Sequence, residues 1–177
     1  MSGHNKWSKI KHKKAATDGQ KSKIFGKYAR LITVEAKKCN GDLNSPGLRT
    51  VIEKAKSENM PNDNIDRAVK KATETGGAEM LEVTYEAYGP GGCAIIIEGL
   101  TENKNKAAAE VRHILSKNGL ELAATGSASW AFTKNEDREW IPSTTIPLDD
   151  KDGEKLGNII EALEENDEVQ AVYTNAD

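Results

Sequence analysis

The chain has few of the features that mark membrane, secreted or disulfide-stabilised proteins. Only 2 of its 177 residues are cysteine, and Cys39 and Cys93 stand far apart in no paired motif. We interpret them as reduced thiols in a cytosolic protein. No apolar run approaches the roughly 18 residues that a membrane-spanning helix needs. Residues 1–14 are basic but have no apolar core or cleavage site, which excludes a secretory signal, although a mitochondrial transit peptide shares this composition.

The sequence also lacks the side-chain patterns of enzymes and metal sites. His4, His12 and His113 have no metal-ligand spacing with each other or with the cysteines, and no local signature of a nucleophile is present. Glycine-rich loops that hold phosphates lead from a strand into a helix. Residues 89–92 (GPGG) instead link two expected strands, and Pro90 at the second position predicts a tight turn. The sequence therefore predicts no catalytic centre, no metal site and no cofactor.

The net charge of −3 conceals a strong difference between the two parts of the chain. Residues 1–75 hold 17 Lys and Arg against 8 Asp and Glu, whereas residues 76–177 hold 8 against 20. Within residues 1–40 the count is 11 against 2, so the basic excess lies there. This asymmetry predicts that the first part contacts a polyanion and that the second part does not.

The cations of this basic segment form the candidate nucleic-acid-binding site. Each cation that neutralises a phosphate releases a counterion, which makes such contacts strong and sensitive to salt. A tryptophan among them can stack on a base, and a histidine can donate to a phosphate. The predicted site residues are Lys6, Trp7, Lys9, Lys11, His12, Lys13, Lys14, Lys23, Lys27 and Arg30. Two alternatives stay open: the cations form a solvated helix face, and Trp7 pins the arm onto the helices.

Hydrophobic periodicity predicts a first domain, residues 1–76, in which a basic arm precedes three helices. Residues 1–20 lack an apolar period and form the arm. Over residues 22–39 the apolar side chains recur at helical spacing, opposite most of the cations. Pro46 and Pro61 each begin a further amphipathic helix, and the third ends at a Gly-Gly pair. Short amphipathic helices on short loops predict a helical bundle.

The second domain, residues 77–177, is predicted to be α+β. The expected elements are strands at 82–88 and 93–98, a helix at 103–118 closed by Gly119, strands at 120–123 and 127–133 joined by a Thr-Gly turn, a helix capped by Asp149 and a strand at 168–174. From Gly92 onward the order is βαββαβ, the ferredoxin-like arrangement. The whole chain is thus expected to be α+β, with a three-helix bundle followed by a ferredoxin-like βαββαβ domain and an extra strand.

Several segments resemble the YebC/PmpR family. The matching segments are residues 3–7 (GHNKW), 10–13 (IKHK), 23–27 (KIFGK), 60–68 (MPNDNIDRA), 85–92 (YEAYGPGG), 110–113 (EVRH) and 167–175 (DEVQAVYTN). They follow one another in order over most of the chain. The resemblance implies a three-helix N-terminal domain followed by α+β domains, in a cytoplasmic or organellar protein.

The resemblance also implies a role in gene expression. The family is described as probable transcriptional regulators that bind DNA, and related members act in translation as activators or relieve ribosome stalling. Neither description implies an enzyme. The family's usual additional α/β domain, expected between Thr133 and Ile141, has no counterpart here, because only residues 134–140 bridge those points.

The leading hypothesis is a cytoplasmic, non-catalytic regulator of gene expression that binds DNA through its basic N-terminal region. The alternative is a translation factor that binds ribosomal RNA on the ribosome, because an acid-free arm suits structured RNA equally well and the sequence shows no helix-turn-helix or zipper. A protein-interaction module, in which the acidic part is the working part, is the second alternative. No membrane partner is predicted, and the sequence specifies no oligomeric state.

Overall fold

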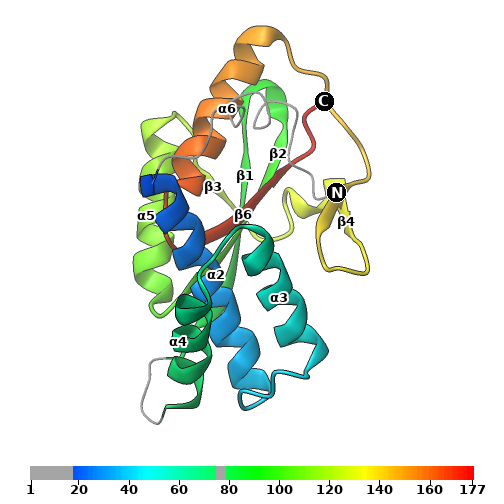
Figure 1. The fold of residues 1–177 in the computed structure, drawn as a ribbon. Helices are drawn as coiled ribbons and strands as arrows, with labels where there is room; N and C mark the ends of the chain where they lie inside the picture. Colours follow the sequence, from blue (N-terminus) through cyan, green and yellow to red (C-terminus); the bar gives the residue numbers. More distant parts are fainter. Residues whose placement is uncertain (1–17, 75–78) are drawn as a thin grey trace. The chain divides into compact units, whose positions relative to one another are not determined.

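The computed structural model describes residues 18–74 and 79–177, which divide into two compact units (Figure 1). One lies within Ala16–Leu81 and contains helices alone. The other is Glu82–Asp177, with a sheet, two longer helices and a small hairpin. None of the helices in the described ranges is long and apolar enough to cross a bilayer. The α+β class expected from the sequence is confirmed.

The first unit consists of α2 (Asp18–Lys38), α3 (Pro46–Ser57) and α4 (Asn62–Thr73). Helix α2 begins four residues before the expected start at residue 22 and packs against both other helices. Pro46 occupies the first turn of α3, where its missing N–H costs nothing. The buried residues of this bundle are Ile32, Ala36, Leu48, Ala55, Met60, Ile65 and Ala68. All of them except Met60, which lies between α3 and α4, come from the apolar faces that the periodicity predicted.

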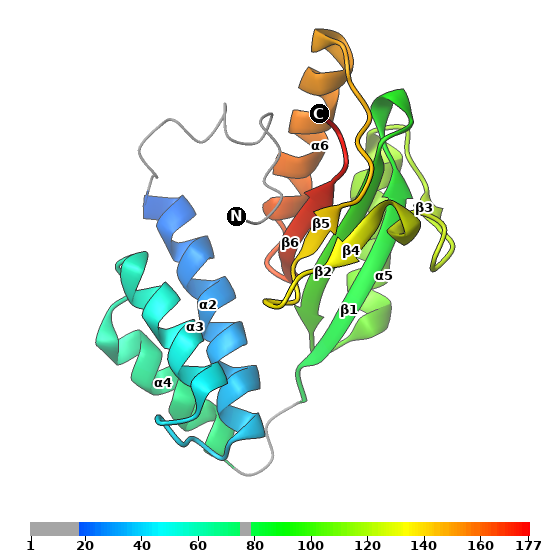
Figure 2. The same cartoon turned by 90° about the vertical axis from the view of Figure 1, so that its right-hand side faces the viewer.

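The second unit is built on a four-stranded sheet in the order β3-β1-β2-β6. Its strands are β1 (Leu81–Tyr88), β2 (Ala94–Thr101), β3 (Leu122–Ala123) and β6 (Val169–Thr174). Helices α5 (Lys104–Lys117) and α6 (Asp150–Glu164) cover one side of this sheet, and the small hairpin lies on the other (Figure 2).

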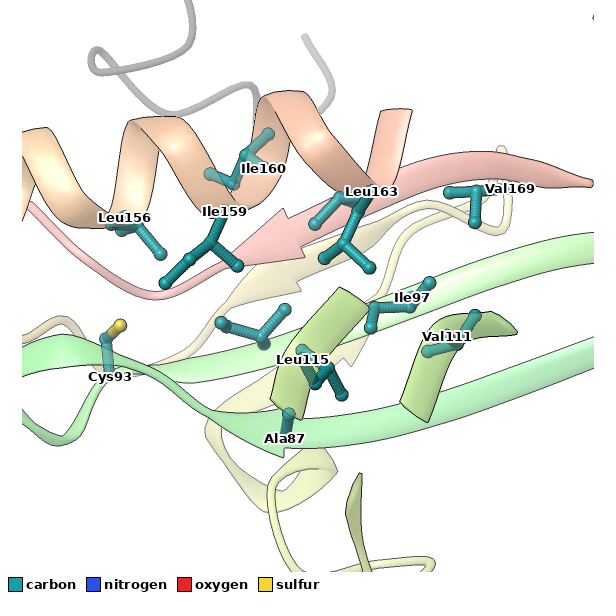
Figure 3. Packing of buried hydrophobic residues seen from close by; sticks show 12 residues of the cluster. Ala87, Cys93, Ile97, Val111, Leu115, Leu156, Ile159, Ile160, Leu163 and Val169 are labelled. Carbon is teal, nitrogen blue, oxygen red and sulfur yellow. The ribbon is translucent and has the colours of Figure 1, made fainter. Parts of the chain in front are cut away.

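Strand β2 is buried on both faces, because successive side chains point to opposite sides of a sheet. Ile95 and Ile97 belong to the cluster under α5 and α6, which Figure 3 shows from close by. Ala94 and Ile96 belong to a second cluster on the hairpin side, together with Phe132. The central strand therefore joins two hydrophobic layers into one folded unit.

Three local predictions in this unit are confirmed. Gly91 has a φ of 67° at the third position of the turn between β1 and β2, and Gly92 N–H donates to Gly89 O at 3.1 Å, the geometry of a type II turn. Gly119, with a φ of 74°, ends α5. Asp149 caps α6 by accepting from Asp152 N–H at 2.7 Å.

The expected strand pairing after α5 is wrong. Residues 127–133 do not form a strand beside 120–123: Ser129–Ala131 is a 3-10 turn, and β4 (Phe132–Lys134) pairs with β5 (Trp140–Pro142) in a separate sheet. Strand β3 pairs with β1 instead. Strand β1 thus takes the place that the ferredoxin-like order gives to residues 127–133, and that strand order is corrected.

A buried carboxylate explains this correction. Glu86 on β1 is 5% exposed and accepts hydrogen bonds from the N–H groups of Gly126, Ala128 and Ser129 at 2.7, 2.8 and 2.8 Å. These N–H groups would otherwise be available to a strand ladder. The carboxylate therefore holds residues 126–129 in a curved loop, where the alternation of apolar and polar residues alone predicted a strand.

Candidate nucleic-acid interface

Seven of the ten predicted site residues lie outside the described residues. They are Lys6, Trp7, Lys9, Lys11, His12, Lys13 and Lys14. The other three, Lys23, Lys27 and Arg30, lie on α2. Their spacing of four and three residues places them on one face of the helix, and all three are half-buried. The structure therefore places the described cations together on a single face.

A groove of about 400 Å³ lies between α2 and α4, which pack against each other (Figure 1). Its charged lining residues are Arg30 of α2 with Arg67 and Lys71 of α4. None of the lining residues is Asp or Glu. Arg30 belongs both to the basic face of α2 and to the groove, so the two features are continuous.

The floor of the groove is apolar. Among the lining residues, Met60 and Ala68 are buried, and Phe25, Ala29 and Met80 are half-buried. Ser22, Thr33 and Asn64 add neutral polar groups to its lining. The Thr33 hydroxyl lies 2.8 Å from Ala29 O and 3.3 Å from Ala68 O, which ties α2 to α4 beside the groove. The buried lining residues are thus apolar, whereas Arg67 and Lys71 are exposed, and we call the apolar lining the floor and the three cations the rim of the groove.

Arg67 is positioned by its neighbour on the same helix. Its Nη2 donates to Asn64 Oδ1 at 2.8 Å, three residues earlier, and the side chain is exposed. A guanidinium carries five N–H donors in a planar fork, so one bond to Asn64 orients the group without using it up. Sequence reasoning missed Arg67 and Lys71. The sequence feature that could have identified them is their spacing of four residues, which places both on one side of α4 beside its apolar stripe.

The second unit carries an exposed aromatic pair. Trp130 and Tyr88 are 63% and 40% exposed, and Trp130 Nε1 donates to the Tyr88 hydroxyl at 3.1 Å. The Tyr88 hydroxyl in turn donates to Ser127 O in the loop that Glu86 holds. Burial raises the pKa of Glu86, but the three backbone hydrogen bonds outweigh it and bring the pKa below its ordinary value. The pair therefore stands on a loop whose backbone N–H groups are bound by the Glu86 carboxylate.

Neither cysteine has the surroundings of a reactive thiol. Cys93 is fully buried, and this burial raises its pKa, so the thiol stays protonated at neutral pH. Cys39 lies just after α2 and contacts carbonyl oxygens in the last turn of that helix. Within residues 18–74 and 79–177, no three His, Cys, Asp or Glu side chains gather in a way that could hold a metal ion.

Comparison with protein families matches both units. The model of the TACO1/YebC protein N-terminal domain matches residues 5–75. The model of the TACO1/YebC second and third domain matches residues 80–136 and 133–176. The two pieces of the second match meet at β4 and the loop that follows it, which is where the sequence predicted the missing domain.

Relatives match over the whole chain. A probable transcriptional regulatory protein of Thermoanaerobacter pseudethanolicus is 39% identical over 239 aligned positions, covering 100% of this chain and 97% of the relative. Another, of Desulfatibacillum aliphaticivorans, is 44% identical, covering 97% of this chain and 74% of the relative. The first alignment is longer than the 177 residues of this chain, so that relative has residues that this chain lacks.

A solved structure agrees with the fold. The crystal structure of a conserved hypothetical protein, Aq1575 from Aquifex aeolicus, is similar with a TM-score of 0.85 and 31% sequence identity. The match covers 98% of this chain and 97% of that chain.

Proposed function

Because the chain belongs to the TACO1/YebC family, and relatives that match its whole length are named probable transcriptional regulatory proteins, we propose that it regulates gene expression by binding nucleic acid through its basic first domain. The observation that carries this proposal is the excess of 11 cations over 2 anions within residues 1–40. A segment of this kind binds phosphates by releasing their counterions. DNA is the proposed target, in line with the names of the relatives.

The arm and the basic face of α2 act together in this proposal. The cations at 6, 9, 11, 13 and 14 hold phosphates along with Lys23, Lys27 and Arg30, while Trp7 and His12 contact bases or sugars. Contacts to phosphates position a protein on nucleic acid without reading its sequence. We propose no catalytic step and no cofactor for this site, and we place the protein in the cytoplasm.

The test is to reverse three charges of the arm. The variant Lys11→Glu/Lys13→Glu/Lys14→Glu should bind duplex DNA more weakly and lower the slope of log K against log salt concentration by about three. Fluorescence anisotropy at several salt concentrations measures both. The matched control reverses Arg112, Lys117 and Lys151, three exposed cations of the second unit, with the same change in net charge. Equal binding by the two variants would reject the arm as the site.

Ribosomal RNA is the second candidate target. The groove between α2 and α4 favours it, because a cationic rim over an apolar floor suits the unpaired bases common in folded RNA. Crosslinking in cells, followed by sequencing of the attached nucleic acid, separates the two targets. Promoter DNA would support transcriptional regulation. Discrete sites in ribosomal RNA would make the protein a translation factor, and recovery of neither would favour a protein-interaction module.

A further inference from the structure

We propose that the groove between α2 and α4 binds one unpaired nucleotide of an RNA or DNA strand, a proposal that rests on the nucleic-acid-binding function above. The phosphate lies among Arg30, Arg67 and Lys71, and the base lies on the apolar floor. The groove's volume of about 400 Å³ falls within the range of small-ligand pockets. It is formed within the helical unit alone.

The lining of the groove matches the two halves of a nucleotide. Arg30, Arg67 and Lys71 all line the groove, and a cluster of cations favours a phosphate. The planar guanidinium of Arg67, oriented by Asn64, fits the oxygen atoms of a phosphate through paired N–H donors. Phe25 and Met80 offer the kind of apolar and aromatic surface on which an unstacked base rests.

Gly26 supplies an independent observation. It lies inside α2 and lines the groove, although glycine costs roughly 0.5–1 kcal/mol relative to alanine inside a helix. Neither packing nor backbone conformation requires it, because an added Cβ would meet nothing within 4 Å and its φ is not positive. A glycine at this place leaves the groove open beside the backbone, with room that a long side chain would fill and that one methyl group would not. Its position beside Arg30 and Phe25 points to a ligand in the groove.

The occupant must be unpaired. In a duplex the bases are stacked inside and only their edges reach the grooves, so a base cannot lie on the floor while its phosphate meets the rim. In a single strand or a loop the base is free to turn outward. The groove therefore favours unpaired strands, in addition to the salt-sensitive binding of phosphates by the basic arm.

The test fills the groove without changing its charge. Gly26→Leu in the full chain places a bulky side chain over the floor, and Gly26→Ala is the matched control, with the same backbone change and no bulk. Both variants should fold at least as well as the parent, because leucine and alanine are better helix formers than glycine. Thermal unfolding verifies this before binding is measured.

Binding is measured by anisotropy with labelled single-stranded RNA, single-stranded DNA and a duplex of the same sequence. We expect Gly26→Leu to bind single strands about tenfold more weakly than Gly26→Ala, and to bind the duplex with unchanged affinity. A loss confined to RNA or to DNA supports the groove and identifies its source of nucleotides. Equal single-strand affinities of the two variants, or a gain for Gly26→Leu, overturn the groove alone. A parent protein that binds no probe overturns the proposed function as well.

A second pair of variants tests the rim. Arg67→Gln removes a cation from the groove, and Arg49→Gln removes one from α3, where it pairs with Glu53 at 3.1 Å outside the groove. We expect Arg67→Gln to weaken single-strand binding several-fold more than Arg49→Gln and to lower the salt slope by about one. Equal effects of the two changes would mean that the cations act only through overall charge, and would overturn the assignment of the phosphate to this rim.

Discussion

At the scale of single residues, the carboxylate of Glu86 joins two segments that lie 40 residues apart in the sequence. It is nearly buried, and three backbone N–H groups of the 126–129 loop donate to it. A buried charge is stable only where hydrogen bonds replace the lost water. The same loop carries Trp130, so this one side chain fixes both the end of the sheet and the exposed aromatic pair.

Replacing Glu86 by glutamine should lower the free energy of unfolding by about 2 kcal/mol at neutral pH, because hydrogen bonds to a charged group are worth more than those to a neutral amide. The folded pKa of Glu86 lies below the ordinary value of 4.5. Its contribution to stability is therefore fully present above that value and is lost as the pH falls through the folded pKa. Urea unfolding of parent and variant across this pH range measures the difference.

Glu121→Gln is the matched control for this experiment, because it removes a carboxylate from an exposed position. Its effect should stay within about 0.5 kcal/mol. If Glu86→Gln and Glu121→Gln unfolded at the same urea concentration, the carboxylate would not be what holds the loop.

Residues also explain which part of the candidate site could be predicted. The cations of α2 stood out because their segment has almost no acid. Arg67 and Lys71 did not, because Asp63 and Asp66 on the same helix balance their charge. In the folded protein, Arg67 and Lys71 join Arg30 in lining the groove between α2 and α4, and no Asp or Glu is among the lining residues. Counting charges along the sequence cannot show that the cations of α4 line the groove while its acidic residues do not, because the groove forms only when α2 and α4 pack together.

At the scale of elements, helices were predicted better than strands. The bundle helices follow from a local period, and their observed bounds lie close to the expected ones. The hairpin expected through residues 120–133 failed because Glu86, far away in sequence, holds the loop, and because β1 offered β3 a better partner. Strand pairing depends on such distant contacts, so local alternation could not decide it.

The β4–β5 hairpin lies at the point in the sequence where the two matched pieces of the family model meet. Asn135 seals its loop: its side-chain oxygen accepts from Glu139 N–H at 2.8 Å, and its own N–H donates to Glu139 O at 3.0 Å. Trp140 packs edge to face on Phe132 and donates to Glu98 Oε1 at 2.7 Å. The hairpin therefore completes the second hydrophobic layer with its own side chains.

This hairpin should accept an insertion. Ten Gly and Ser residues placed between Glu136 and Asp137, both exposed, should lower the free energy of unfolding by only about 1 kcal/mol, the cost of a longer loop. The same insertion between Gly91 and Gly92 should cost at least twice as much, because it would break the turn hydrogen bond from Gly92 N–H to Gly89 O, 3.1 Å long, between β1 and β2. Urea unfolding measures both. If the two insertions lowered the free energy of unfolding by similar amounts, the hairpin would tolerate an insertion no better than the tight turn does, and the prediction would be wrong.

At the scale of the whole molecule, charge and hydrophobic packing divide the chain in the same way. Residues 1–75 carry the basic excess and residues 76–177 the acidic one. The cluster of the helical unit draws its residues from positions 25–72, whereas the two clusters of the sheet unit draw theirs from positions 85–176. Each part thus has its own core and its own sign of charge, and we propose that residues 1–76 and 77–177 are separate domains.

Separate domains should fold and act separately. A fragment of residues 77–177 should show a single cooperative unfolding transition in urea, because both faces of its sheet are covered by its own residues. It should not bind nucleic acid, since its acidic excess repels phosphates. A fragment of residues 1–76 should bind with an affinity close to that of the full chain. If neither fragment bound but the full chain did, the binding surface would require both parts, and the basic domain would not be sufficient as the nucleic-acid interface.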